Sequence, residues 1–579
     1  MKSFFKSFFA SLLAIVVVIV IIFIVGLTAI SVSGKKETVK DGSYLVIDIY
    51  GDIQEYRPPV GIMSEIIGDR TETLQRILGN LEKASVDERI KGVIMKMSGT
   101  NNAGRAMIQE IREAIKMVQK KGKKVYGFSD SIDRKTCFLA SACDSVFMPP
   151  TAYITFFGFS VTTEHFRGTL DKLEINPQLH KIKDYKSAAE MIMDKKMSKP
   201  ARDNKEWMLD EFWDMYVQAL REDRGIGEDE IIEIMEMATL SAQDAKQVSL
   251  IDSVMYWDEI EEMLKGTDDE LRVVSQEEYA RISPRIVGLR GKKKIAVIHA
   301  QGTIGGRKNK VDPMLGIMMG HESIAEELEK AREDDGVAAI VFRVNSPGGE
   351  SLGSDLMSHE VDVTKEKKPV VVSMVDVAAS GGYYIAYRAS KIVADPMTVT
   401  GSIGSISGKM NINGLNEKVG ITHDFVKKGP NALMFSPYKD FTDKQWKIFT
   451  DNHLEGFNRW LKDVAEHRGM TFNEAQKLAH GRVWTGRQGK KNGLVDELGG
   501  LTRAVEVARE LAGIEPEEKV TLVHYPIRKT LFESIISGQF DLAAAVNHII
   551  YKYIREDLAE TWEMISSKRL YMLDRMEIN

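Results

Sequence analysis

Short apolar runs alternate with longer segments of helical periodicity over most of the chain. Ile295–His299, Ala339–Val344 and Val370–Val375 are short and apolar, as buried strands are. Between the first two, the segment ESIAEELEKARED, which begins at Glu322, places its apolar residues at helical spacing behind capping residues. Strands that alternate with helices in this way predict parallel sheets and an α/β fold.

Four segments of the first half recur in the second half, in the same order and at an offset of about 245 to 250 residues. The pairs are YLVIDIYGDI and KIAVIHAQGTI, DERIKGVIMKMSG and DDGVAAIVFRVNSPGG, REDRGI and AEHRGM, and ATLSAQDAKQVSLID and RVWTGRQGKKNGLVD. A period this long indicates two copies of a whole domain and not a solenoid. We expect a first repeat over 43–265, a charged linker over 266–292, a second repeat over 293–527 and an amphipathic helical tail over 528–579.

The N-terminal segment is apolar over a length that suits a membrane. No charged residue occurs between Ser7 and Gly34. A bilayer requires about 20 apolar residues, and the apolar region of a cleaved signal peptide is shorter. The pattern therefore predicts a retained membrane anchor over 1–34. Lys2 and Lys6 favour a cytoplasmic N-terminus, which would place the bulk of the chain outside the cytoplasm.

Composition excludes several classes of function. The chain has 579 residues, of which 43% are hydrophobic and 28% charged, as in folded proteins with large cores. The net charge of -6 and the lack of a basic stripe argue against a nucleic-acid partner. Two cysteines make neither a disulfide scaffold nor a zinc site, so we expect Cys137 and Cys143 to be buried apolar residues.

Three glycine-rich motifs in the second repeat carry candidate chemistry. The first, NSPGGE, follows a predicted strand, and its Gly348 and Gly349 permit a turn that aims backbone N–H groups at an oxyanion. In the second, VAASGGYYIA, Ser380 lies between a strand and a helical run. A nucleophile suits that place, since the helix dipole favours developing negative charge. The third, TGSIG, contains Ser402. An ordinary tight turn and an N-cap serine are the alternative interpretations.

A serine nucleophile requires a base, and the residues alone leave its identity open. None of the 11 histidines lies in a setting typical of a catalytic triad, although a Ser-His-Asp triad stays an alternative. A buried lysine with a lowered pKa can serve instead. The first repeat has Lys186 in the motif DYKSAAE, but a lysine in a charged stretch is usually a solvated surface residue.

The motifs NSPGG, VAASGGYYIA, TGSIG, GRVWTG and GLVDELGG, together with DYKSAAE, resemble those of the signal peptide peptidases of the protease IV type. The resemblance is to the long, duplicated form of that family and extends from the anchor to about Val523. It implies that Ser380 is the nucleophile, that Lys186 is the base and that Ser402 orients the lysine.

The same resemblance implies that Gly348 and Gly349 supply the oxyanion hole, joined by the N–H of Gly381. It further implies a Clp-protease and crotonase-like fold, a ring-shaped homo-oligomer such as a tetramer, and chemistry without a metal or cofactor. Remnant signal peptides are the substrate class it implies, at a bacterial inner membrane crossed by one N-terminal helix.

The internal repeat bears on this assignment independently of the resemblance. Alignment of the two copies puts Arg134 or Lys135 opposite Ser380, and Asn431 or Ala432 opposite Lys186. Each copy therefore retains one half of the dyad, as expected after duplication of a domain whose active site spanned a subunit contact.

We therefore expect a membrane-anchored serine endopeptidase that hydrolyses apolar peptides on the extracytoplasmic side. Two rival functions stay open at this point. One is a crotonase-like acyl-CoA enzyme, whose oxyanion hole also uses glycine-turn amides but needs no Ser-Lys pair. The other is a non-catalytic membrane scaffold. Labelling with a fluorophosphonate separates the three, because only an activated serine reacts.

Overall fold

The computed structural model describes most of the chain between the predicted anchor and the predicted tail. The described residues are 39–49, 51, 53–57, 72–97, 102–266, 269–312 and 316–526. The predicted anchor (1–34) and tail (528–579) lie outside these ranges. Among the helices within them, none is long and apolar enough to cross a membrane.

Each half of the described chain contains one large sheet that is mainly parallel, and the two large sheets have the same strand order. In the first sheet the order is β11 (Ser253–Val254), β7 (Ser145–Met148), β5 (Lys124–Phe128), β4 (Ile90–Lys96), β1 (Ser43–Asp48) and β12 (Val273–Ser275). In the second the corresponding order is β23 (Glu497–Leu498), β19 (Lys391–Ala394), β18 (Val370–Ala379), β17 (Val337–Ser346), β13 (Lys293–Gln301) and β24 (Val520–Tyr525). The three predicted strands of the second repeat lie within β13, β17 and β18, and the fold is mixed α/β.

Shorter strands flank both sheets. In the second repeat, β20 (Val399–Gly401) extends the sheet beyond β18 and pairs antiparallel with β22 (Val483–Thr485). The first repeat has a corresponding small sheet of β10 (Thr239–Ser241), β8 (Tyr153–Thr155) and β6 (Ser131–Ile132). The remaining short strands are β2 (Ile53–Gln54), β3 (Glu72–Thr73), β14 (Thr303–Ile304), β15 (Lys310–Asp312) and β16 (Gly316–Met319).

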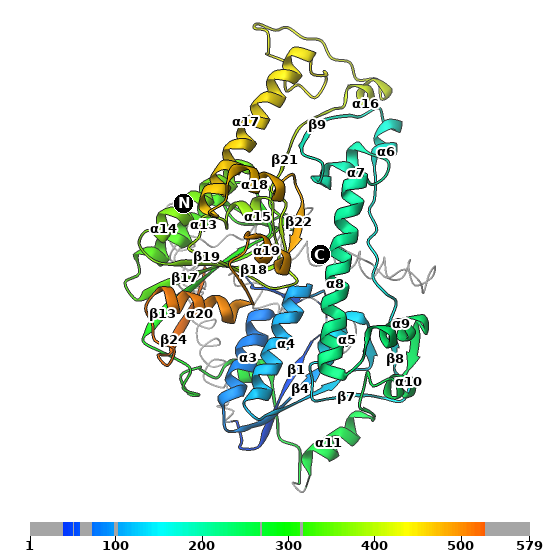
Figure 1. The fold of residues 1–579 in the computed structure, drawn as a ribbon, viewed down its shortest axis with the longest axis vertical. Coiled ribbons are helices and arrows are strands. Elements are labelled where there is room, and N and C mark those ends of the chain that lie inside the picture. The colour runs from blue at the N-terminus through cyan, green and yellow to red at the C-terminus, as the bar shows by residue number, and fades with distance from the viewer. Residues whose placement is uncertain are drawn as a thin grey trace, which may run out of the picture.

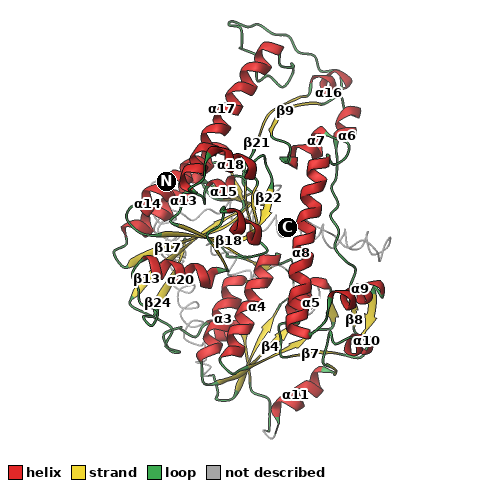
Figure 2. Cartoon of the chain, in the orientation of Figure 1, coloured by secondary structure: helices red, strands yellow, loops and turns green. Residues whose placement is uncertain are grey.

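Helices connect the strands and cover the sheets (Figures 1 and 2). Those of the first repeat are α3 (Leu74–Val86), α4 (Arg105–Lys120), α5 (Arg134–Ala140), α6 (Arg167–Lys172), α7 (Glu190–Met193), α8 (Lys199–Arg224), α9 (Glu228–Glu236), α10 (Ala242–Gln247), α11 (Trp257–Lys265) and α12 (Gln276–Ala280). Those of the second are α13 (His321–Glu333), α14 (Ser351–Lys365), α15 (Gly381–Tyr384), α16 (Asn413–Lys418), α17 (Asp443–His467), α18 (Phe472–Leu478), α19 (Gly486–Asn492) and α20 (Leu501–Leu511).

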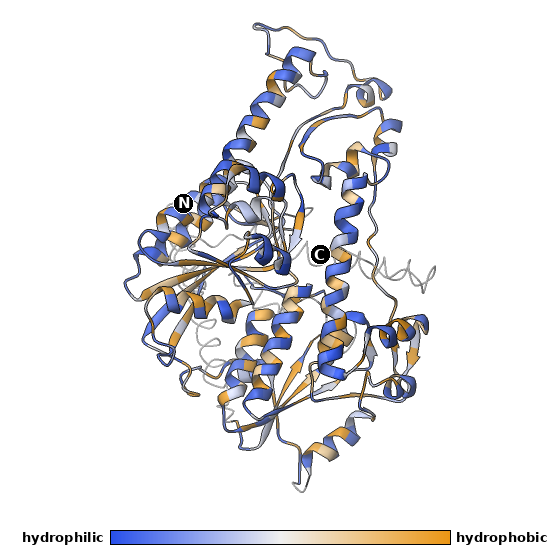
Figure 3. Ribbon diagram, viewed as in Figure 1, coloured by the Kyte–Doolittle hydropathy of each residue, from blue (hydrophilic) through white to orange (hydrophobic). Residues whose placement is uncertain are grey.

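The second sheet is buried on both faces, as its uninterrupted apolar strands require. Along β13, Ala296 and Ile298 pack into a core with residues of α13 and α14. Their neighbours Ile295 and Val297 pack into a separate core against α20. Apolar colour accordingly runs along the strands in Figure 3, whereas the helices carry polar residues on one face.

Several elements of the two repeats correspond residue by residue. Helix α6 (Arg167–Lys172) and helix α16 (Asn413–Lys418) are 246 residues apart at both ends. The same offset relates β8 to β20. The segment predicted as a linker is not wholly irregular, because it contains β12, which pairs with β1 at the edge of the first sheet. Val274 in β12 is buried in the core of the first repeat.

The two repeats meet over a surface that we call the inter-repeat joint. Strand β9 (Asn176–Ile182) of the first repeat pairs antiparallel with β21 (Ser405–Asn411) of the second, from Ile182 opposite Ser405 to Asn176 opposite Asn411. Ile182 belongs to the core of the second repeat. In return, Val375 and Met397 belong to the core of the first repeat. The apolar core of each repeat therefore includes residues of the other repeat at the joint.

A buried ion network crosses the same joint. Arg343 on β17 is fully buried, and its guanidinium donates to Glu55 at 3.0 Å and to Glu110 at 2.6 Å. Glu55 also contacts Nδ1 of His299 at 2.9 Å. Burial by itself raises the pKa of Glu55, but His299 and Arg343 together hold it well below its usual value. Because both glutamates come from the first repeat, Arg343 fastens the repeats together.

Asp376 makes a second polar link across the joint. This residue of β18 accepts hydrogen bonds from the backbone N–H groups of Ala106 at 2.9 Å and Met107 at 3.3 Å, and so caps helix α4 of the other repeat. The helix's own N-cap residue is Gly104, where a Cβ atom would lie 2.0 Å from Cγ of Asp376. A glycine at this position therefore allows the carboxylate of one repeat to reach the helix of the other.

Candidate active site

Ser380 lies at a strained turn between β18 and α15. Its φ of 56° and ψ of -116° are rare for a residue with a side chain. The turn is held on both sides. The N–H of Ser380 donates to the carbonyl of Gly401 at 2.9 Å, and its carbonyl accepts from the N–H of Tyr384 at 2.9 Å. The hydroxyl is thus presented by the end of a buried strand and the start of a helix.

Lys186 reaches Ser380 from the other repeat. It follows β9, and the pairing of β9 with β21 carries it across the inter-repeat joint. Its side chain is buried, with 6% of the residue exposed, so its interpretation as a solvated surface lysine is wrong. Nζ of Lys186 lies 2.9 Å from Oγ of Ser380.

Ser402 completes the surroundings of the lysine. Nζ of Lys186 donates to Oγ of Ser402 at 2.9 Å and to its carbonyl oxygen at 3.1 Å. Ser402 has a φ of 50°, and its N–H donates to the carbonyl of Arg482 at 2.8 Å. The lysine is therefore aimed at Ser380 by two acceptors of one residue, which is itself fixed by the backbone.

Burial lowers the pKa of Lys186 to about 8. The charged form of a buried lysine loses hydration. Its three hydrogen-bond partners within the described ranges, the hydroxyls of Ser380 and Ser402 and the Ser402 carbonyl, carry no charge that would compensate. A substantial fraction of Lys186 is therefore neutral, and able to accept a proton, slightly above neutral pH.

The glycine turn of NSPGG packs directly against the Ser380 turn. Gly348 has a φ of 101°, and a Cβ atom there would lie 2.5 Å from the amide nitrogen of Gly381 and 2.9 Å from Cβ of Ser380. A Cβ atom on Gly381 would lie 3.0 Å from the amide nitrogen of Gly349. All six candidate residues named from the sequence therefore come together around one point.

The amides of this turn differ in how they are engaged. The N–H of Gly348 already donates to the hydroxyl of Ser346 at 3.1 Å, and this hydroxyl in turn donates to the carbonyl of Gly302 at 2.7 Å. In the part of the chain that the structure describes, the amides of Gly349 and Gly381 have no acceptor. Two N–H groups beside the serine are thus available to a negatively charged oxygen.

Sequence reasoning missed the support that the segment before β22 gives to the lysine. The carbonyl of His480 accepts from the N–H of Tyr185 at 3.1 Å. Gly481 has a φ of 81°, and a Cβ atom there would lie 2.5 to 2.6 Å from backbone and Cβ atoms of Lys186. The guanidinium of Arg482 covers the ring of Tyr185 at 4.0 Å. The glycine of the motif GRVWTG is the sequence signal for this contact.

The corresponding positions outside the joint hold other residues. Arg134 begins helix α5 in the place that Ser380 has before α15, and its guanidinium stacks on Phe159 and donates to the carbonyl of Gly158. Ala432, opposite Lys186 in the alignment, is exposed in the loop after α16. Of these described positions, those at the inter-repeat joint therefore bring a serine and a lysine together, whereas their counterparts in the other repeat do not.

The hydroxyl of Ser380 is engaged by an amine and not by an imidazole. Among the described residues, Lys186 is its hydrogen-bond partner, and His299 is held by Glu55 in the ion network. The described part of the chain contains no group of three or more His, Cys, Asp or Glu side chains that could hold a metal ion. Cys137 and Cys143 are buried, and burial raises the pKa of each thiol to about 12.

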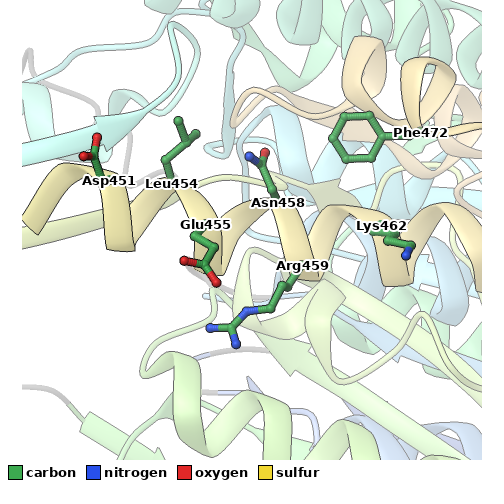
Figure 4. Close-up of a pocket in the computed structure, with 7 residues that line it drawn as sticks. All are labelled: Asp451, Leu454, Glu455, Asn458, Arg459, Lys462 and Phe472. Atoms are coloured by element: carbon green, nitrogen blue, oxygen red, sulfur yellow. The ribbon is translucent and has the colours of Figure 1, made fainter. Parts of the chain in front are cut away.

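A surface pocket lies elsewhere, along helix α17 (Figure 4). Its lining consists of Asp451, Leu454, Glu455, Asn458, Arg459, Lys462 and Phe472. None of these is a residue of the Ser380 site. These residues carry charges of both signs but include no nucleophile beside a base. The candidate active site is therefore the Ser380 site at the inter-repeat joint and not this pocket.

Comparison with known proteins identifies the family. The model of peptidase family S49 matches the chain twice, over residues 117–270 and 362–515. The chain is 30% identical over 509 residues to "Serine protease SPPA, chloroplastic" of Arabidopsis thaliana, covering 87% of this chain and 74% of the relative. It is 30% identical over 516 residues to "Protease 4" of Haemophilus influenzae, covering 84% of this chain and 82% of the relative.

A solved structure of a ClpP1 mutant from Listeria monocytogenes is 15% identical and covers 36% of this chain and 94% of its own, with a TM-score of 0.24. A TM-score this low does not establish a shared fold, so the Clp-protease and crotonase-like fold of the repeats stays a prediction. The double match to the family model and the two relatives, each aligned over more than two thirds of its length, are decisive: the chain belongs to peptidase family S49 and is a serine protease.

Proposed function

We propose that this serine protease works through a dyad in which Ser380 is the nucleophile and Lys186 the general base. The observation that carries the proposal is the 2.9 Å contact between Nζ of Lys186 and Oγ of Ser380. It is supported by burial that lowers the pKa of the lysine to about 8. The neutral amine removes the hydroxyl proton as Oγ of Ser380 attacks the scissile carbonyl carbon.

The oxyanion that forms is bound by the amides of Gly349 and Gly381. We assign it to these two because the amide of Gly348 is engaged by Ser346. The role of Gly348 is then conformational: because it has no Cβ atom, the turn can lie close to Ser380 without a clash. The protonated Lys186 returns its proton to the leaving amine, and Ser402 keeps the lysine aligned through both transfers. Water hydrolyses the acyl-enzyme by the same steps, with Lys186 again as the base.

The substrate we propose is an apolar peptide at a membrane surface, of which remnant signal peptides are the expected class. Two features support this: the uncharged segment between Ser7 and Gly34, and the resemblance of the motifs to those of the protease IV type. We further propose a single-pass anchor over 1–34 in a bacterial inner membrane, the catalytic part on the extracytoplasmic side, and a homo-oligomer.

The nucleophile assignment is tested by Ser380→Ala. We expect peptide hydrolysis and fluorophosphonate labelling to disappear, while thermal unfolding stays that of the wild type, because one small residue replaces another. Arg134→Ala, at the corresponding position of the first repeat, is the matched control and should keep full activity. Hydrolysis that survives in a folded Ser380→Ala protein would refute the assignment.

A further inference from the structure

Two histidines that are far apart in the sequence meet at the inter-repeat joint. His180 belongs to β9 of the first repeat, and His453 belongs to α17 of the second. Helix α17 packs against β9 in the upper part of the molecule as drawn in Figure 1. The Nδ1 atoms of the two rings lie 2.9 Å apart. The proposed mechanism of hydrolysis uses neither histidine, so this pair needs an explanation of its own.

The geometry of the pair restricts the protonation of the two facing nitrogens. Two imidazole nitrogens form a hydrogen bond only when one carries a proton and the other presents an unprotonated lone pair. Two protonated rings at this distance would repel each other. The pair of His180 and His453 therefore contains a nitrogen in the form that binds a metal ion.

The far side of His453 is held in the way that metal-binding imidazoles are held. Its Nε2 lies 2.8 Å from Oγ of Ser405 on β21. A histidine that binds a metal through one nitrogen usually donates a hydrogen bond from the other, which fixes the tautomer and the ring orientation. The ring of Trp446 packs edge-on against that of His180, with centroids 6.1 Å apart. Both imidazoles are therefore oriented by their neighbours.

The spacing of the two nitrogens suits a small divalent cation. Zn²⁺ binds imidazole nitrogens at about 2.0–2.1 Å in a tetrahedral arrangement, which puts two such nitrogens about 3.3 Å apart. The rings would have to separate by about 0.4 Å from their 2.9 Å contact. The proton between them would move to Nε2 of His180. Both side chains are half-buried, so water can reach the cation and complete its four ligands.

The same side chains might be taken for a second catalytic serine with a histidine base, but the backbone argues against this. Ser405 begins β21 and pairs with Ile182 of β9 in a regular antiparallel ladder. A serine nucleophile requires free amides beside it to bind an oxyanion, whereas the amides of a paired strand serve the ladder. We therefore assign the histidine pair the role of a ligand and not that of a base.

We propose that His180 and His453 bind a divalent transition-metal cation of the Zn²⁺ type and thereby clamp the first repeat to the second. Imidazole ligands suit Zn²⁺, Cu²⁺ and Ni²⁺ and are poor ligands for Mg²⁺ or Ca²⁺. The inference goes beyond the proposed function, because the cation takes no part in hydrolysis. Strand β9 leads to the segment of Lys186, and β21 follows that of Ser402. A cation at this place would hold both segments of the site together.

Titration of the full-length protein with Zn²⁺ tests the clamp. The two histidines meet only in the folded chain, so Zn²⁺ at about 100 times its Kd should raise the melting temperature by about 2–5 °C. His453→Gln and His180→Asn each replace a ligand by an amide and should abolish this rise. Ser405→Ala should weaken Zn²⁺ binding by about tenfold in calorimetry.

His359→Ala is the matched control, since His359 is an exposed histidine of α14 and should not affect Zn²⁺ binding. Unfolding of each variant without metal shows whether the substitution itself disturbs the fold. The absence of a rise in the wild type would overturn the proposal. A folded His453→Gln or His180→Asn protein that binds Zn²⁺ as tightly as the wild type would overturn it as well.

The fluorescence of Trp446 provides a second readout that leaves both histidines in place. Cu²⁺ quenches the emission of a nearby indole, and the ring of Trp446 lies beside that of His180. Cu²⁺ should therefore quench the part of the emission that Trp446→Phe removes, and excess Zn²⁺ should restore it by competition. In Trp446→Phe the remaining emission should not respond to the same Cu²⁺ concentration. Quenching of equal size in Trp446→Phe would place the cation elsewhere and overturn the proposal.

Discussion

The two repeats share a strand order but differ in the side chains at the dyad and at positions beside it. Where the second repeat has Ser402 beside the lysine, the first has Phe156, which is fully buried. The N–H groups of both residues donate to equivalent carbonyls, those of Arg482 and Ala238. The backbone is thus conserved between the repeats while the side chain that would orient a lysine is not.

The same contrast holds at the glycine beneath the lysine. Gly481 leaves room for Lys186, whereas Met237 occupies the corresponding place in the first repeat and is 47% exposed. The comparison teaches that the fold alone does not make a site. Chemistry arises where one repeat offers a serine turn, the other offers a lysine, and the residues around both leave space for their contact.

Among the substitutions that test this difference between the repeats, Lys186→Ala is expected to have the largest effect on activity. Without the base, kcat/KM should fall by about 10⁴-fold or more, as in other hydrolases that lose one member of a catalytic unit. Ala432→Lys, which restores a lysine only at the position outside the joint, is the matched control and should neither add activity nor rescue the variant. Rates with a chromogenic peptide measure both. A Lys186→Ala enzyme that retains about a tenth of the activity would contradict the dyad.

The next largest effect is on stability and concerns the ion network that links the two repeats. Arg343→Ala leaves Glu55 and Glu110 buried without their cation, so the free energy of unfolding should decrease by about 3–5 kcal/mol. Lys96→Ala alters the corresponding strand position of the first repeat, where the ammonium lies over the ring of Trp257, and should cost about 1 kcal/mol or less. Urea unfolding of both variants provides the values. Equal losses would show that the network has no special part in the joint.

A smaller effect is expected from Gly481→Ala. The added Cβ atom would press on Lys186, and the φ of 81° is strained for alanine, so the lysine should shift relative to Ser380. We expect kcat to fall by about 10- to 100-fold with little change in KM, because positioning and not binding is impaired. Met237→Ala, at the equivalent exposed position, should leave kcat unchanged. A rise in KM with kcat unchanged would contradict the positioning role.

Much of the fold could be predicted from the sequence, since the strands of the second repeat are apolar throughout and the duplication is visible in four ordered pairs. Ser380 was accessible for the same local reason, because a serine between a strand and glycines is a recognisable pattern. Two features of the site could not be predicted: the positive φ of Ser380, and the hydrogen bond from the Gly348 N–H to the Ser346 hydroxyl. Both result from how two loops pack against each other.

Lys186 shows the limit most clearly. Its local sequence is charged, and only the pairing of β9 with β21, between residues more than 200 positions apart, buries it against Ser380. The resemblance to a known family pointed to this lysine, whereas periodicity and spacing did not. The ion network was also hidden, because a single arginine in an apolar strand does not reveal that Glu55 and Glu110 will meet it.

The central claim is that neutral Lys186 activates Ser380, and the pH dependence of fluorophosphonate labelling tests it most directly. Burial lowers the pKa of Lys186 to about 8, and the protonated form cannot accept a proton. The labelling rate should therefore rise about tenfold per pH unit below about pH 8 and level off above it. Lys186→Arg should label at least about 10³-fold more slowly at every pH, because a guanidinium stays protonated. An inflection near about pH 6.5 that persists in Lys186→Arg would indicate a histidine base and contradict the account.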